Sequence, residues 1–306
     1  MKEPNTEEQR MRILGVFAHP ADTVTECGGT LAVHARRGDE VMAVVLTHGG
    51  RVHPNIYIEE ARKNAGEREA GVAEAKEDRI IAIKHAEIER AAEILGIRHL
   101  QCLDYDDVML VVRPEIIERV AEILSEFRPH VLVTHHPGFH ASTGADHCIA
   151  GQIAGAAATR AAQRLANLDG RERHYIKQTF YIGSGISSRS VLVPGGGPAN
   201  DVYVDITPVV DLKVRAMDQF VSQGYEGDFA RKCVSGHNGH WGNYAGVAFA
   251  EPFMRASVEV YDALPVGRIR RERDEITYHR TYSRSTNLWQ IPREPSPTDR
   301  FVGKKG

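Results

Sequence analysis

Short, mostly apolar runs alternate with amphipathic segments along the chain. Continuous apolar runs are typical of strands buried on both faces of a parallel sheet. They lie at 13–18, 41–47, 98–103, 130–134, 178–182 and 202–207. The segments between them predict helices at 28–37, 84–95, 114–127, 148–162 and 208–222. Because strand–helix–strand units build α/β proteins, the pattern predicts an α/β fold with a mostly parallel sheet and helices on both faces.

Two segments depart from this alternation. Residues 51–83 are rich in Glu, Lys, Arg and Ala, and they predict an insertion that is either a solvated surface segment or a loop covering a substrate. Residues 264–306 are Arg-rich and then Pro- and Ser-rich, which predicts a C-terminal extension or arm. We therefore expect one domain over 1–263, with a smaller β- and loop-rich part near its end.

Composition narrows the classes of function. The 306 residues are 42% hydrophobic with a net charge of −3, which fits a globular protein without the strong positive charge that recruits nucleic acid. No apolar run is long enough to span a membrane, and the polar first ten residues do not resemble a signal peptide. The four cysteines form no Cys-x-x-Cys pair and predict reduced thiols in a cytoplasmic protein.

Metal-binding side chains follow two of the predicted strands. His19 and Asp22 come directly after the first strand, and four histidines with Asp146 fall within residues 135–147. Ligands of open α/β sheets bind at the carboxyl ends of the strands, so we expect these loops to meet there. Imidazole and carboxylate groups are common zinc ligands, and a catalytic zinc needs three of them with one open position. The sequence therefore predicts one zinc, or another divalent metal, per chain.

The wider strings make this prediction more specific. Residues 18–22, Ala-His-Pro-Ala-Asp, precede Gly-Gly-Thr-Leu at 28–31, and Asp146-His147 precedes a helix. Together with Ala-Glu-Pro-Phe at 250–253, they resemble the PIG-L/LmbE-like deacetylases, which have a Rossmann-like fold and remove acetyl groups from N-acetylglucosamine-type substrates. The resemblance implies zinc ligation by His19, Asp22 and His147. It also implies a homo-oligomer.

Two positions depart from the family pattern. The motif carboxylate that acts as general base is Ala21 here, and the histidine that stabilises the oxyanion is Gly144. A methyl group cannot accept a proton, so another group must activate water if the chain is a hydrolase. Asp146, Glu26 and His140 are the candidate bases, in that order. The imidazole candidates are His140, His136 and His135.

The resemblance also implies contacts with a sugar-like small-molecule substrate. Lys84 and Asp107 match a basic residue on a family helix and an Asp that binds a sugar hydroxyl. His237, His240 and Trp241 lie in a stretch dense in side chains that hydrogen-bond and stack on sugars. That stretch forms a pocket wall, an oligomer contact or ordinary core.

Three functions fit this set of residues. The first is a zinc-dependent amide hydrolase acting on an N-acyl amino sugar. The second is a catalytically silent or repurposed homologue that keeps its metal and binds a sugar. The third is a metal-assisted lyase or isomerase, in which the metal polarises a carbonyl. No Gly-x-Gly-x-x-Gly follows the first strand, which argues against nucleotide binding.

Overall fold

A seven-stranded sheet forms the centre of the molecule. The computed structural model describes residues 10–68, 72, 76–107, 111–138, 145–163, 173–183, 200–272 and 286–299. The strand order is β3-β2-β1-β4-β5-β7-β6. The pairs from β3 through β5 are parallel, and β7 is antiparallel to both β5 and β6. The predicted α/β fold with a mostly parallel sheet is confirmed.

The strands are short and, near the centre, almost completely buried. Their bounds are β1 Arg12–Phe17, β2 Glu40–Thr47, β3 His99–Tyr105, β4 Val131–Thr134, β5 Gln178–Ile182, β6 Val202–Asp205 and β7 Ala250–Arg255. In β2 every residue after Glu40 is buried, as expected for a strand covered on both faces. The smaller β- and loop-rich part expected near the end of the domain contributes β6 and β7 to the same sheet.

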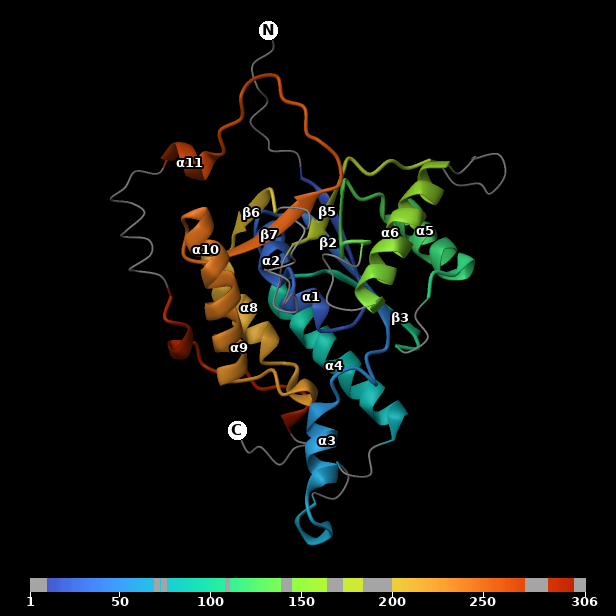
Figure 1. Ribbon diagram of the computed structural model, residues 1–306, viewed down its shortest axis with the longest axis vertical. Helices are drawn as coiled ribbons and strands as arrows, with labels where there is room; N and C mark the ends of the chain where they lie inside the picture. The colour runs from blue at the N-terminus through green and yellow to red at the C-terminus, as the bar shows by residue number, and fades with distance from the viewer. Residues whose placement is uncertain are drawn as a thin grey trace.

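Helices cover both faces of this sheet (Figure 1). One core cluster joins the sheet to α2 Gly28–Arg36, α4 Glu77–Leu95 and α8 Val210–Met217. The other joins it to α5 Pro114–Phe127 and α6 Ala145–Gln163, which pack side by side. The remaining helical segments are α1 Asp22–Thr25, α3 Asn55–Arg62, η1 Ala65–Glu67, η2 Thr207–Val209, η3 Val221–Gln223, α9 Asp228–Cys233, the π-helical η4 Val234–Asn238, α10 Gly239–Ala245, α11 Arg268–Glu272 and η5 Leu288–Gln290.

Several predicted boundaries were wrong. The helix expected at 84–95 begins at Glu77, where two acidic residues occupy its first turn, so part of the expected insertion is helical. The helix expected over 208–222 ends at Met217 because the chain then forms the tight turn η3. β7 was not predicted, since Pro252 lies within it and proline is rare inside strands.

Candidate metal centre

The His19 loop and the start of α6 meet at the carboxyl edge of the sheet. β1 ends at Phe17 and delivers His19, and Asp22 is the first residue of α1. β4 ends at Thr134, and α6 then carries Asp146 and His147 in its first turn. Since β1 and β4 are neighbouring parallel strands, their loops converge. The structure thus brings the three predicted metal ligands together.

Ligand atoms of His19, Asp22 and His147 all lie within 4.8 Å of one another. Asp22 Oδ2 is 3.3 Å from His19 Nδ1 and 3.4 Å from His147 Nε2. The same oxygen accepts the backbone N–H of His19 at 2.8 Å, which fixes the turn between the two residues. His19 and Asp22 are buried, and His147 is nearly so.

These residues fit a bound divalent cation. His19 Nε2 is buried and forms no well-oriented hydrogen bond with a described residue; the Asp146 carboxylate is 3.4 Å away, and a buried imidazole nitrogen placed in this way is suited to a ligand. Two imidazoles with one carboxylate form a donor set of the kind that catalytic zinc uses. The described part of the chain therefore contains a site suited to such an ion.

The electrostatics of this site also favour positive charge. Burial works against ionisation of Asp22, but His147 and His19 hold its pKa well below the usual range. Burial likewise opposes protonation of His19, but Asp22, Asp146 and Asp107 outweigh it and raise its pKa to about 10. The pKa of His147 is raised as well, because Asp22 outweighs the effect of burial. A cation placed among these groups meets the same attraction.

His135 packs against His147 and was not among the predicted ligands. Its ring stacks on that of His147, with centroids 4.3 Å apart and planes 5° apart. The Ala18 N–H donates to His135 Nε2 at 3.2 Å, which ties the ring to the end of β1. Burial, and then the neighbouring His147, lower the pKa of His135 to about 4, so it is neutral at physiological pH. Its Nε2 also lies 3.4 Å from Asp22 Oδ2, so the neutral ring contacts both Asp22 and His147.

The other predicted imidazoles are placed differently. His136 accepts the N–H of Gly138 at 3.0 Å, and its ring meets the edge of Tyr181, 5.1 Å between centroids. His136 is therefore held beside β5. His140, predicted as a catalytic residue, lies outside the described residues.

Three positions matter for the choice of a general base: Asp146, Glu26, and Ala21, which replaces the carboxylate of the family motif. Asp146 Oδ2 lies 3.4 Å from His19 Nε2, and 43% of its side chain is exposed. The contact with His19 lowers the pKa of Asp146. Glu26 is buried, and Ala21 is buried in the apolar core at the N-cap of α1. Asp146 is thus the half-exposed carboxylate beside the site.

Lys84 and Asp107 lie close by, but their polar atoms bind the chain itself. Asp107 accepts the backbone N–H groups of Gly49 and Arg51 at 2.7 and 2.8 Å. Lys84 Nζ donates to the carbonyl of Val52 at 3.2 Å, and burial lowers its pKa to about 8. Asp107 thus ties the loop after β2 to the end of β3, and Lys84 ties the same loop to α4. Their contact with a substrate stays a prediction.

His237, His240 and Trp241 lie in η4 and α10, away from the cluster of ligands. Trp241 packs on Tyr203 of β6, 6.0 Å between ring centroids, and His240 meets the edge of Trp241 at 4.8 Å. β6 is the last strand of the sheet, and β4, β5 and β7 separate it from β1. The structure places these aromatic side chains at the sheet edge, so their predicted contact with substrate stays untested.

A buried ion pair behind the site was missed by sequence reasoning. Lys213 and Glu251 are fully buried, with Nζ 2.6 Å from Oε1. Glu251 also accepts the N–H groups of Gly29 and Thr30 at 2.9 and 2.6 Å. It thereby caps the amino end of α2, the helix that follows the His19 loop. The sequence feature that pointed to Glu251 was the family-like string Ala-Glu-Pro-Phe at 250–253.

Fold and site together define an open α/β protein with a metal-ligand cluster at the carboxyl edge of its sheet. Residues 14–158 match the model of the PIG-L family, described as GlcNAc-PI de-N-acetylase, so this part of the chain is similar to a PIG-L (LmbE-like) domain. No helix in the described residues is long and apolar enough to cross a membrane.

Two relatives carry the same description, 1D-myo-inositol 2-acetamido-2-deoxy-alpha-D-glucopyranoside deacetylase. The protein of Mycobacterium sp. (strain KMS) is 30% identical over 151 residues, 44% of this chain and 46% of the relative. That of Mycobacteroides abscessus is 27% identical over 223 residues, covering 67% and 74%. The chain thus spans about half the length of the first relative.

Solved structures share the fold. GalB, the 4-carboxy-2-hydroxymuconate hydratase from Pseudomonas putida KT2440, has a TM-score of 0.63 and 22% identity, over 83% of this chain and 100% of that chain. N,N'-diacetylchitobiose deacetylase from Pyrococcus horikoshii has a TM-score of 0.61 and 20% identity, over 81% and 84%. These likenesses concern the fold.

Proposed function

We propose that the chain is a zinc-dependent hydrolase that cleaves the amide bond of an N-acyl amino sugar or a related small molecule. The observation that carries the proposal is the cluster of His19, Asp22 and His147 at the edge where α/β proteins bind ligands. The deacetylases among the relatives support amide hydrolysis. The metal expected is one zinc per chain.

A zinc ion held by these ligands would polarise the amide carbonyl and lower the pKa of a water molecule. Among the described residues, Asp146 is best placed to accept a proton, because it is half-exposed and adjoins the site. Its lowered pKa keeps it ionised at neutral pH but makes it a weaker base. We therefore expect slower turnover than in an enzyme with a carboxylate at position 21.

Acetate release from N-acetylglucosamine derivatives tests this proposal. Positioned general bases typically contribute about 10²–10⁴-fold, so Asp146→Asn should reduce the rate within that range while zinc content is unchanged. Ala21→Asp should increase the rate. Asp104→Asn is the control. Asp104 of β3 pairs with His85 of α4, so loss of the Asp104 carboxylate should leave the rate unchanged. Native protein that holds zinc but releases no acetate would refute the proposal.

Ala21 favours a second candidate, a metal-assisted hydratase or lyase. The buried methyl group leaves the position of the family's water-activating carboxylate without a base. Addition of water to a double bond conjugated with a carbonyl requires that the carbonyl be polarised, which a metal ion would do. The proton transfers of this reaction do not require a carboxylate at position 21. GalB, which shares the fold, is a hydratase. Loss of ultraviolet absorbance from an unsaturated keto acid, without acetate release from amides, would favour this candidate.

A further inference from the structure

The loop after β2 leaves the sheet beside the metal-ligand cluster. Thr47, the last residue of β2, donates to the carbonyl of Ala18 from its N–H at 3.0 Å and from its hydroxyl at 2.8 Å. Two residues later, a Cβ on Gly49 would lie 2.7 Å from the ring of Pro20. Residues 49–54, called here the β2 loop, therefore pack directly on the residue that follows the first metal ligand.

His53, in the β2 loop, has a left-handed backbone conformation with a φ of 47°. Residues other than glycine seldom adopt it, and where the surrounding structure imposes it, the position is often functional. The backbone is fixed on both sides of His53. The buried Lys84 ammonium donates to the carbonyl of Val52 at 3.2 Å. The side-chain amide of Asn55 donates to the carbonyl of Gln223 at 2.9 Å. The chain thus holds this histidine in one place.

The imidazole of His53 responds to the charges of the ligand cluster. Although the residue is exposed, partial burial of the ring, then the Lys84 ammonium and the imidazoles of the cluster, lower its pKa against an opposing effect of Asp22. His53 is therefore neutral at neutral pH and carries one ring N–H. Its ring centroid lies 6.5 Å from that of Tyr225, and neither ring nitrogen has a hydrogen-bond partner among the described residues. Because Coulomb interactions weaken with distance, this response places the ring near the proposed metal site.

Other histidines near the carboxyl ends of the strands are already engaged. His135 stacks on a ligand imidazole. His136 accepts the N–H of Gly138, and His48 accepts the N–H of Gly50, each at 3.0 Å. In the part of the chain that the structure describes, the imidazole of the β2 loop thus differs from these in having both nitrogens available.

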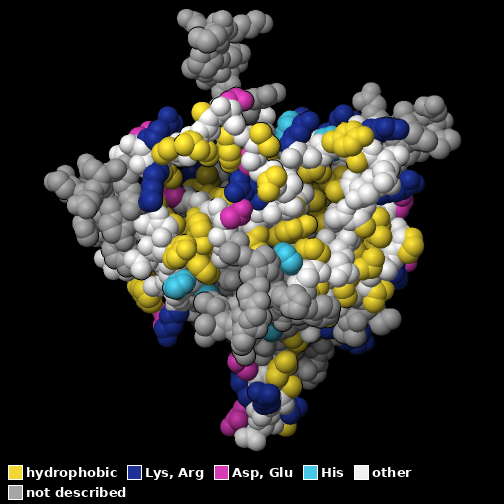
Figure 2. Space-filling view, turned by 45° about the horizontal axis from the view of Figure 1, so that its top comes forward, with side chains coloured by type: hydrophobic (Ala, Val, Ile, Leu, Met, Phe, Trp, Pro, Cys, Tyr) yellow, Lys and Arg dark blue, Asp and Glu magenta, His cyan; other side chains and the backbone are white. Residues whose placement is uncertain are grey.

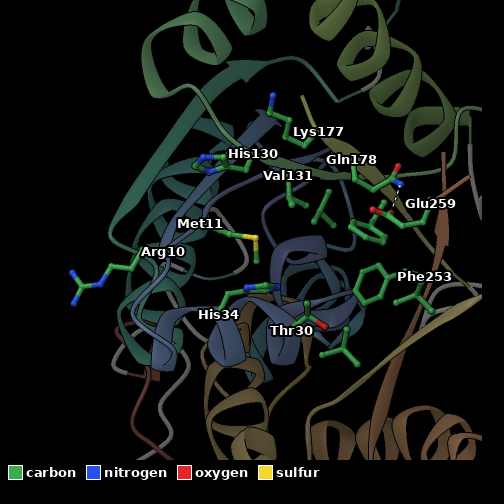
Figure 3. A pocket seen from close by; sticks show the side chains of 14 residues that line it. Arg10, Met11, Thr30, His34, His130, Val131, Lys177, Gln178, Phe253 and Glu259 are labelled. Carbon is green, nitrogen blue, oxygen red and sulfur yellow. Dashed lines mark hydrogen bonds between the residues drawn. The ribbon is translucent and has the colours of Figure 1, made fainter. Parts of the chain in front are cut away.

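A cavity of about 490 Å³ supplies no further imidazole to the cluster, because it lies at the opposite edge of the sheet, at the amino ends of β1, β4 and β5 (Figure 3). Figure 2 shows hydrophobic side chains gathered on this side of the molecule. The histidines that line the cavity also contact the chain itself. His34 Nδ1 lies 2.7 Å from the carboxylate of Asp39, and His130 accepts the N–H of Arg12 at 2.9 Å.

We propose that the His53 imidazole donates a hydrogen bond to the oxyanion that forms during hydrolysis of the substrate amide. When the water oxygen bonds to the carbonyl carbon, the π electrons of the C=O bond move to the carbonyl oxygen, which becomes negative. The ring N–H stabilises this charge, and no proton is transferred in doing so. His53 would thereby fill, from another strand, the role left open by Gly144. The inference rests on the proposed amide hydrolysis.

Steady-state kinetics of acetate release test this role. One oxyanion donor contributes about 10²–10³-fold to kcat, so His53→Gly should lower kcat by that factor, with KM and zinc content little changed. Glycine adopts the left-handed backbone freely, so this variant removes the imidazole without altering the loop. His53→Gln restores an N–H donor and should be at least about tenfold faster than His53→Gly. His99→Ala is the control, because His99 pairs with Glu40 on the surface and its loss should leave kcat unchanged.

Unchanged kcat in His53→Gly, when the native chain releases acetate, would overturn the inference. A large loss in His140→Ala instead would assign the donor to His140.

Binding of a tetrahedral probe tests the same role without turnover. The N-methylphosphonyl derivative of glucosamine copies the oxyanion, whereas N-acetylglucosamine is planar at the amide. In calorimetric titrations of the zinc-loaded chain, His53→Gly should bind the phosphonyl probe about a hundredfold more weakly and the planar sugar about equally well. Equal affinity of native and variant chains for the phosphonyl probe would overturn the role of His53. If the native chain released no acetate yet showed this selective loss, the hydrolysis would be refuted and the donor role of His53 retained.

Discussion

Removal of the Glu251 carboxylate should destabilise the whole fold, although this residue lies behind the site. Among the described residues, Glu251→Ala leaves the fully buried ammonium of Lys213 with the carbonyl of Thr25, 2.9 Å away, as its remaining hydrogen-bond partner. It also removes the acceptor for the N–H groups of Gly29 and Thr30. Hydrogen bonds to charged groups contribute about 1.5–3 kcal/mol each, and breaking a buried ion pair costs about 3–5 kcal/mol. We expect a loss of at least about 3–5 kcal/mol of unfolding free energy, the cost of the broken ion pair before the two lost hydrogen bonds are added.

Urea unfolding followed by circular dichroism measures this loss, with an unchanged m-value showing that the same structure unfolds. The double variant Lys213→Met and Glu251→Gln should be more stable than Glu251→Ala, since it buries no charge and keeps an acceptor. Glu118→Ala breaks a pair with Arg160 whose side chains are 40% and 50% exposed, and it should cost under about 1 kcal/mol. If Glu251→Ala cost no more than Glu118→Ala, the structural role assigned to this pair would be refuted.

Three further outcomes follow from the geometry of the site. Zinc affinity should rise at least about tenfold per pH unit between pH 6.5 and 8.5, measured by chelator competition, because His19, with a pKa raised to about 10, must lose a proton to bind metal, and the raised pKa of His147 acts in the same direction. His135→Ala should weaken zinc binding roughly tenfold in the same assay, since the ring that packs against His147 is lost. Gly29→Ala should lower the urea midpoint, because the new Cβ would lie 2.8 Å from the side chain of Ile206.

Each of these predictions has a control variant or a result that would contradict it. A zinc affinity that is flat or falls with rising pH would contradict the raised pKa values of the two histidines. His136→Ala should bind zinc like the native chain, because its imidazole lies beside Tyr181 rather than His147. Gly155→Ala, in α6 where a Cβ meets nothing within 4 Å, should leave the urea midpoint unchanged or raise it. Equal effects of the two glycine substitutions would argue against close packing at Gly29.

The clustering of His19, Asp22 and His147 could be predicted because the residues follow strands that the apolar pattern identifies. Apolar runs fix the ends of β1 and β4, and parallel strands place the loops after them at one edge, where His19 and His147 meet. The packing of His135 under His147 was not predictable, since several histidines occur within a few residues and only the orientation of the strand chooses among them.

Long-range partnerships also escaped prediction. The pairing of Lys213 with Glu251 joins residues 38 positions apart and depends on β7, which Pro252 hid from pattern analysis. Asp107 matched a family position assigned to sugar binding, yet both of its carboxylate oxygens accept backbone N–H groups. Motif spacing identifies such a residue but does not show whether its oxygens are already occupied.

Metal content tests the central claim most directly. The native chain, purified without chelators and examined by elemental mass spectrometry, should contain about one zinc per chain. His147→Ala should lose that zinc while keeping the native circular dichroism spectrum, and His136→Ala should keep both. A native chain without metal that also fails to bind added zinc would contradict the assignment of His19, Asp22 and His147 as a metal site.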